Sequence, residues 1–135
     1  MSSDLGINPK TSKPYTVILV DDSRSMRMYL KQFLLSEKFE VISEANDGSE
    51  AVRAIKILDI KPDIMFIDVE MPELNGIETV KAIKPLLPNT KFIMETGKTD
   101  PETVKELLSL KIDGYIVKPY DRKVLSDKIT AILKS

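Results

Sequence analysis

Residues 63–68 read DIMFID, a short apolar run with an aspartate at each end. Residues 16–22, TVILVDD, have the same form and close on two acids. Short runs rich in Val, Ile and Phe are typical of strands, and an apolar run without alternating polar residues is typical of a strand covered on both faces. Because such strands occur in parallel sheets with helices on both sides, these two stretches favour an α/β fold.

Three further strand-like runs follow, and a helical pattern separates each run from the next. The runs span residues 39–45, 91–95 and 114–117. In the segments between and after them, apolar residues recur at spacings of three and four, as from Met26 to Leu30, which gives each segment one apolar face. The strict alternation predicts a doubly wound (βα)5 fold, with a five-stranded parallel sheet and right-handed crossovers.

Capping residues precede several of the predicted helices. Asp47 and Asn75 are each followed three residues later by a glutamate, which is typical of a capping box. Asp100 is followed by proline, as expected for an N-cap before proline at the first helical position. Asp121 stands where it can cap the last helix. These residues predict where four of the helices begin.

The composition excludes several kinds of chemistry. The chain has 135 residues, with no Cys, no His and no Trp, and its length fits one domain. Without Cys or His there is no disulfide, thiolate nucleophile, imidazole base or metal site built from these residues. Any metal must therefore be a hard cation held by oxygen atoms, such as Mg²⁺, Mn²⁺ or Ca²⁺.

The net charge and the hydropathy of the chain limit the partners it can bind and the cellular location we expect for it. The net charge of −1, from 20 Lys+Arg and 21 Asp+Glu, argues against a nucleic-acid-binding surface. No apolar run approaches the roughly 18 residues of a membrane span, and the first ten residues lack a signal-peptide core. We expect a cytoplasmic protein without membrane insertion. Residues 1–14 are polar, which predicts a flexible N-terminal extension before a domain over residues 15–135.

Polar side chains follow four of the five predicted strands. Asp21 and Asp22 follow the first strand, Asp68 the third, Thr96 the fourth and Lys118 the fifth. An aspartate after a strand is commonly a turn or capping residue, but the carboxyl ends of parallel strands meet at one edge, where ligands bind in such folds. The convergence at four strand ends therefore favours a functional site over four separate turns.

The residue types at this edge suit phosphate chemistry. Crowded carboxylates repel one another, and a divalent cation such as Mg²⁺, which prefers about six oxygen ligands, removes the conflict. Thr96 and Lys118 would donate to a bound phosphate. In a chain without Cys or His the nucleophile left is a carboxylate, and aspartate can form an acyl phosphate.

These motifs resemble the receiver domain of two-component response regulators, and above all its stand-alone, CheY-like chemotaxis type. The segments that carry the resemblance are VILVDDSRSMR (17–27), EANDGSEAV (44–52), IDVEMPELNGIE (67–78), Thr96 with Gly97, and GYIVKP (114–119). They extend over nearly the whole chain from Thr16 onward. The resemblance implies a flavodoxin-like sheet with the strand order 2-1-3-4-5.

The resemblance also implies residue roles. Asp68 would accept the phosphoryl group, and it would bind Mg²⁺, or Mn²⁺ in its place, together with Asp21, Asp22 and the backbone carbonyl of Glu70. Lys118 would contact the phosphoryl group.

The same resemblance implies a switch. Thr96 would bond the phosphoryl group and draw in the loop after its strand, and Tyr115 would move between outward and inward rotamers. The bond between Lys118 and Pro119 would be cis. The output surface would be the fourth helix, the fifth strand and the fifth helix.

The implied function is a monomeric, phosphorylation-controlled switch rather than an enzyme acting on a separate substrate. A CheA-like histidine kinase would supply the phosphoryl group, and a downstream protein of chemotaxis or motility would bind the phosphorylated form. The open alternatives are a phosphorelay intermediate that serves a histidine phosphotransfer protein, an inert binding module, a metal nuclease of the Toprim type, and a small phosphohydrolase with an aspartate nucleophile.

Three residues depart from the usual receiver pattern. Glu70 and Lys98 lie two residues after Asp68 and Thr96, and the resemblance implies that these two positions flank the path of the attacking water. Their opposite charges predict an ion pair that partly covers the site and slows self-dephosphorylation. Glu95 stands where the family usually has an apolar residue, so its carboxylate needs a polar partner or solvent.

Overall fold

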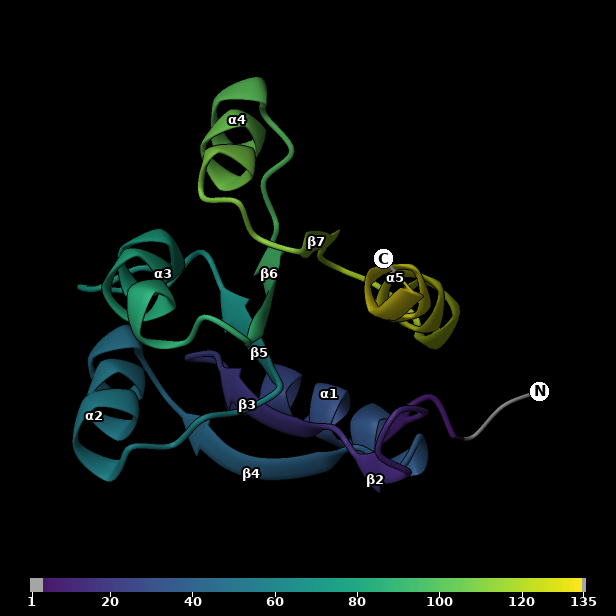
Figure 1. Ribbon diagram of the computed structural model, residues 1–135. Coiled ribbons are helices and arrows are strands. Elements are labelled where there is room, and N and C mark those ends of the chain that lie inside the picture. Colours follow the sequence, from purple (N-terminus) through teal and green to yellow (C-terminus); the bar gives the residue numbers. More distant parts are fainter. Residues whose placement is uncertain (1–3, 135) are drawn as a thin grey trace.

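The computed structural model describes residues 4–134 and contains a five-stranded parallel sheet with helices on both faces (Figure 1). In chain order the strands are β3 (Thr16–Val20), β4 (Glu40–Ala45), β5 (Ile64–Asp68), β6 (Lys91–Thr96) and β7 (Gly114–Val117). Across the sheet they follow the order β4-β3-β5-β6-β7, and every neighbouring pair is parallel. This is the order 2-1-3-4-5, so the predicted doubly wound, flavodoxin-like fold is confirmed.

The helices form two layers, one on each face of the sheet. They are α1 (Arg24–Ser36), α2 (Gly48–Leu58), α3 (Gly76–Ile83) with its 3₁₀ extension η1 (Lys84–Leu86), α4 (Pro101–Ser109) and α5 (Arg122–Lys134). Buried side chains of α1 and α5 pack on one face, and those of α2, α3 and α4 pack on the other (Figure 1). Along β3, Ile18 faces the second of these layers and Leu19 the first. Both residues are buried, as an apolar strand covered on both faces requires.

The predicted caps are present. Asn75 and Glu78 form a complete capping box at the start of α3. Asp47 accepts a hydrogen bond from the amide of Glu50, but the Glu50 carboxylate accepts one from the amide of Asn46, one residue before the cap. The side chains of Asp100 and Asp121 accept hydrogen bonds from the third residue of α4 and α5 respectively. Each of these helices therefore begins where the sequence predicted.

The N-terminal segment corrects one prediction, because residues 4–14 are a docked hairpin and not a flexible extension. The short strands β1 (Ile7–Asn8) and β2 (Lys13–Pro14) pair in antiparallel fashion. Next to them, the amide of Gly6 donates to the carbonyl of Glu37 (2.7 Å), after α1. A Cβ at Gly6 would lie 2.3 Å from the Phe39 backbone nitrogen, so only glycine allows this approach. Residues 1–3 of the predicted extension lie outside the described residues.

Truncation of Leu5 tests whether the hairpin contributes to stability. Leu5 is partly buried against the α1–α5 core, so Leu5→Ala is expected to lower the free energy of unfolding by about 1 kcal/mol. Urea unfolding measures the change. Lys10→Ala, at an exposed position of the same hairpin, is the control and is expected to stay within about 0.5 kcal/mol of the parent. Equal stability of the two variants would mean that the hairpin contributes nothing through Leu5.

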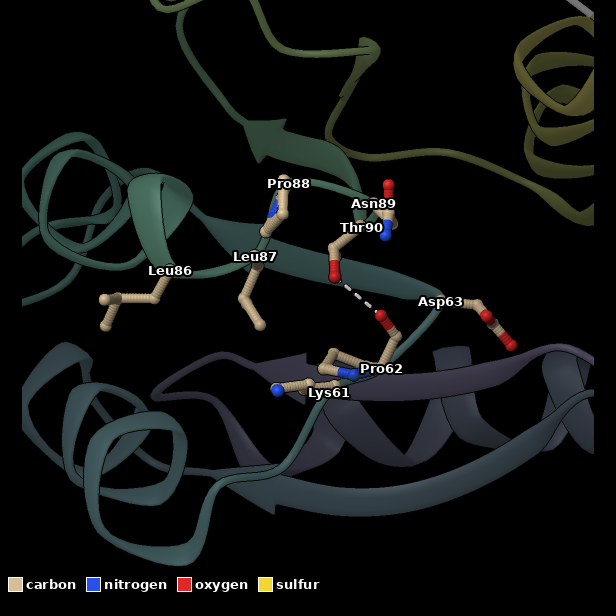
Figure 2. Close-up of a pocket in the computed structure, with 8 residues that line it drawn as sticks. All are labelled: Lys61, Pro62, Asp63, Leu86, Leu87, Pro88, Asn89 and Thr90. Atoms are coloured by element: carbon tan, nitrogen blue, oxygen red, sulfur yellow. Dashed lines mark hydrogen bonds between the residues drawn. The ribbon is translucent and has the colours of Figure 1, made fainter.

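A cavity of about 320 Å³ lies at the amino-terminal edge of the sheet (Figure 2). It is lined by residues 61–63, before β5, and by residues 86–90, which run from the last residue of η1 to the residue before β6. The Thr90 hydroxyl donates to the carbonyl of Pro62 (2.6 Å) across this cavity. The predicted site lies at the other end of the same strands. Within residues 4–134, no helix has the length and apolar character needed to cross a membrane.

Candidate functional site

The carboxyl ends of β3 and β5 bring three aspartates together. Val20 pairs with Ile67 in the sheet, so the residues that follow them, Asp21 and Asp68, lie at the same edge. Oxygen atoms of Asp21, Asp22 and Asp68 lie within 4.8 Å of one another. Asp21 and Asp68 are only 3% and 2% exposed, whereas Asp22 faces solvent. The predicted acidic cluster is therefore present in the structure.

Asp68 is held from two sides. The Lys118 ammonium donates to its Oδ1 at 2.8 Å, and the backbone amide of Glu70 donates to the same oxygen at 3.3 Å. Burial nevertheless raises the pKa of Asp68 to about 6, and the negative charge of Asp21 acts in the same direction. Burial also raises the pKa of Asp21, against the effect of a hydrogen bond from the Ser23 amide.

This donor set fits a hard divalent cation. Two buried carboxylates with raised pKa values and a third, exposed carboxylate give clustered oxygen ligands whose mutual repulsion a cation relieves. Oxygen-only ligation is what Mg²⁺ and Mn²⁺ accept, and the exposed side at Asp22 leaves room for the waters that Mg²⁺ usually retains.

The loop that carries Asp21 is fixed by a residue that the sequence did not single out. One terminal nitrogen of Arg27 donates to the carbonyl of Asp21 (2.6 Å), and its Nε donates to Glu44 (3.2 Å). Lys31 also donates to Glu44 (2.9 Å), and this bond, partly opposed by burial, lowers the pKa of the Glu44 carboxyl. The sequence contains one sign of this arrangement. Arg27 and Lys31 are four residues apart, so they lie one turn apart on α1 and can reach the same acidic partner.

Glu70 contacts a different partner from the one predicted. Its carboxylate accepts hydrogen bonds from the Thr96 hydroxyl (2.7 Å) and from the Gly97 amide (2.8 Å). Among the described residues, the ion pairs within 4.0 Å do not include Glu70 with Lys98, so the predicted pair is wrong for this structure. Lys98 contributes its backbone amide instead, which donates to the Thr96 hydroxyl oxygen (2.9 Å). The Glu70 carboxylate therefore accepts from two neutral donors, and the side chain of Lys98 is exposed.

Glu95 has the partner that its position requires. It is 2% exposed, pairs with Asp68 in the sheet register, and accepts a hydrogen bond from the Tyr120 hydroxyl (2.7 Å). Burial raises the pKa of Glu95 to about 7 despite this bond. The same burial, together with the negative charge of Glu95, raises the pKa of Tyr120. Sequence reasoning missed Tyr120, which lies in the loop after the cis bond between Lys118 and Pro119 that the structure confirms.

Tyr115 lies on β7, away from the acidic cluster. It pairs with Met94 in the sheet, two residues before Thr96, and the Lys128 ammonium of α5 lies 5.8 Å from its ring centroid. The ring lines a groove of about 350 Å³ between α4 and α5, with Leu108 among the other lining residues. Its role as a switch stays a prediction.

Fold and site together define a class: doubly wound α/β domains with a cation-compatible acidic pocket at the carboxyl edge of the sheet. A family model described as "Response regulator receiver domain" matches residues 17–130, and the chain belongs to this family. Its members of the CheY type are signalling proteins, so the class predicted from the motifs is confirmed.

Two curated relatives illustrate the likeness to CheY. Chemotaxis protein CheY of Thermotoga maritima is 36% identical over 118 residues, which cover 87% of this chain and 97% of that protein. Chemotaxis protein CheY of Treponema pallidum is 36% identical over 121 residues, which cover 90% of this chain and 84% of that protein.

Two solved structures share the fold closely. One is the CheX–CheY–BeF3–Mg complex of Borrelia burgdorferi, with a TM-score of 0.88, 34% identity, and coverage of 97% of this chain and 98% of that chain. The other is chemotaxis protein CheY4 of Vibrio cholerae, with a TM-score of 0.77, 31% identity, and coverage of 87% and 98%. The first match extends beyond residues 17–130, so it includes part of the N-terminal segment.

Proposed function

We propose that this receiver domain accepts a phosphoryl group on Asp68, with Mg²⁺, and that phosphorylation changes which protein it binds in chemotaxis or motility. The observation that carries the proposal is the environment of Asp68. Its carboxylate is buried at the end of β5, beside Asp21 and 2.8 Å from the Lys118 ammonium. In the proposed reaction Asp68 is the nucleophile, Asp21 helps to bind the cation, and Lys118 supplies a positive charge for the phosphoryl group.

The proposed reaction is an in-line displacement at phosphorus. A carboxylate oxygen of Asp68 forms the new O–P bond while the bond from phosphorus to the donor's leaving atom breaks. Lys118 offsets the charge on the phosphoryl oxygens and remains beside Asp68. Asp21, Asp22, Asp68 and the Glu70 carbonyl would hold Mg²⁺, which supplies further charge stabilisation when bound.

The phosphodonor and the target complete the proposal. The chain has no histidine, so a histidine phosphotransfer step needs a partner that carries the phosphohistidine, which we propose is a CheA-like kinase. We propose that the target binds the α4–β7–α5 face, where Leu108 is 62% exposed and Val124 41%. The CheY of the Borrelia complex is bound to the protein CheX, which supports a protein partner here. The proposal retains the predicted cytoplasmic location.

The site argues against the phosphohydrolase alternative. Such an enzyme needs an acid two residues after its nucleophile to protonate the leaving group. In such enzymes that acid is an aspartate, whereas this chain has the longer Glu70 there, and in the unphosphorylated protein its carboxylate accepts hydrogen bonds from Thr96 and Gly97.

Phosphorylation of Asp68 is directly testable. After treatment with acetyl phosphate and Mg²⁺, intact-protein mass spectrometry is expected to detect one phosphoryl group, and the Asp68→Asn variant is expected to carry none. Asp59→Asn is the matched control, because Asp59 is exposed and its left-handed backbone (φ 53°) suits asparagine as well. An equal adduct on Asp68→Asn, or none on the parent, would contradict the proposal.

A further inference from the structure

The carboxylate of Glu70 joins two donors of the loop between β6 and α4. Its Oε2 accepts from the Thr96 hydroxyl at 2.7 Å, and its Oε1 accepts from the Gly97 amide at 2.8 Å. Each carboxylate oxygen therefore has one donor, and both donors point at the same anion. Hydrogen bonds to a charged acceptor are stronger than neutral ones, so this arrangement fixes the first residues of the loop.

These donors lie beside the proposed phosphoacceptor. The Glu70 amide donates to Asp68, and from this point the Glu70 side chain reaches across to the neighbouring strand β6. Thr96, at the end of β6, is fully buried, so it has no solvent partner. Its hydroxyl has a single proton, and the bond to Glu70 uses it. A phosphoryl oxygen on Asp68 and the Glu70 carboxylate cannot both receive that proton.

We propose that the Glu70 carboxylate is an internal competitor of the phosphoryl group, which holds the Thr96 and Gly97 donors until phosphorylation displaces it. This inference rests on the proposed function of Asp68. The competition makes Glu70 a positioning residue: it fixes the β6–α4 loop in the unphosphorylated protein and lowers the affinity of the site for a second anion.

The surroundings allow the displacement. Glu70 borders an open hollow of about 470 Å³, which is also lined by Met71, Asn75 and Thr103. The hollow offers the side chain space away from Thr96, and its charged lining residues are Lys98, which attracts a carboxylate, and Glu106, which repels one. A phosphoryl group adds about −1.5 to −2 charge next to Glu70, and this repulsion favours the displaced position.

The first experiment measures the contact itself and needs no phosphodonor. In the metal-free protein, NMR follows the Gly97 amide in the parent, in Glu70→Gln and in Glu70→Ala. Removal of the acceptor is expected to raise the hydrogen-exchange rate of the Gly97 amide at least about tenfold in Glu70→Ala, with a smaller rise in Glu70→Gln, which keeps one neutral acceptor.

The second experiment measures competition. Beryllofluoride is titrated into the protein at saturating Mg²⁺. Its apparent affinity is expected to increase by about tenfold in Glu70→Ala and by less in Glu70→Gln. The increase corresponds to the loss of one charge-assisted hydrogen bond to the Glu70 carboxylate. Mg²⁺ affinity is measured separately, because the backbone carbonyl of Glu70 is a predicted metal ligand that both variants retain.

Glu73→Gln separates competition from simple charge removal. Glu73 is exposed on the same loop, and its substitution removes one negative charge without touching Thr96 or Gly97. If charge alone matters, Glu70→Gln and Glu70→Ala give the same affinity, and Glu73→Gln changes affinity in the same direction. Competition predicts a graded order, with Glu70→Ala above Glu70→Gln and Glu73→Gln close to the parent.

Failure of this inference differs from failure of the proposed function. Unchanged Gly97 exchange in Glu70→Ala overturns the contact, whatever happens at Asp68. Faster exchange with unchanged beryllofluoride affinity overturns the competition. Absence of any beryllofluoride response in all variants contradicts the proposed function of Asp68 and removes the basis for competition, even if the Gly97 result confirms the contact.

Discussion

At pH 8 the Glu95→Gln variant is expected to be more stable than the parent protein, by about 2 kcal/mol in the free energy of unfolding. The reason is the buried position of Glu95, which raises its pKa from an ordinary value of 4.5 to about 7 in the folded chain. Between these two values the folded state binds the proton and the unfolded state releases it. At pH 8 the folded protein therefore carries a buried charge that glutamine lacks.

The sign follows from linkage. A folded-state pKa above the unfolded value gives stability that is complete below about pH 4.5 and is lost as the pH rises through about 7. The full difference corresponds to about 3 kcal/mol. Glutamine recovers less than this, because its carbonyl can accept from Tyr120 while its NH₂ group needs an acceptor of its own. The gain is expected to disappear near pH 4.5, where the parent carries the neutral acid.

Urea unfolding between pH 5 and pH 8 measures this effect, with Glu106→Gln on the exposed side of α4 as the control. The parent and the control are expected to lose stability as the pH rises, and Glu95→Gln to lose less. A remaining slope is expected from Asp68, whose pKa is raised to about 6, and from Asp21, whose pKa is also raised by burial, and saturating Mg²⁺ should reduce this part. Identical slopes in parent and Glu95→Gln would show that Glu95 does not titrate in this range.

The parts of the site that sequence reasoning could predict are those fixed by topology. Asp21, Asp22 and Asp68 follow apolar strands, and once the strands are parallel neighbours, the side chains after them must meet. The same argument puts Thr96 and Lys118 at that edge. The strand order itself came from the resemblance of the motifs, because apolar runs alone do not say which strands are neighbours.

The parts that could not be predicted depend on backbone donors and on distant partners. The pairing of Glu70 with Lys98 was inferred from charge and spacing, but the carboxylate bonds to the Thr96 hydroxyl and to the Gly97 amide, which has no side-chain signature. Tyr120 lies 25 residues from Glu95 in the chain, and its bond to Glu95 depends on the path of the loop after β7.

The N-terminal hairpin was missed for a similar reason. Its composition is polar, and composition is the basis on which a flexible tail is predicted. The contacts that order residues 4–14 include backbone hydrogen bonds, such as that from Gly6 to Glu37, the ion pair between Asp4 and Lys38 (2.8 Å), and the apolar side chain of Leu5. A few contacts of this kind leave little trace in the average hydropathy of a segment.

Gly76→Ala is expected to destabilise the protein by about 2–3 kcal/mol, although alanine is the better helix former. Gly76 is buried at the start of α3, where a Cβ would lie 2.3 Å from the Asp68 carbonyl oxygen and 2.8 Å from the Val69 Cα. Both neighbours are backbone atoms, so no side chain can rotate away. The Gly76 amide also donates to the Val69 carbonyl (3.0 Å), which holds α3 against the end of β5.

The same clash connects stability to the site. To accommodate alanine, the helix must move away from residues 68 and 69, which disturbs the backbone that carries the Asp68 carboxylate. Urea unfolding measures the loss of stability, and Gly97→Ala is the control for that measurement. A Cβ at Gly97 has its nearest neighbour, a Glu70 oxygen, at 3.7 Å, so its cost is expected to stay within about 0.5 kcal/mol. Similar costs at both glycines would mean that the close approach of α3 to β5 relaxes freely when a Cβ is added at Gly76.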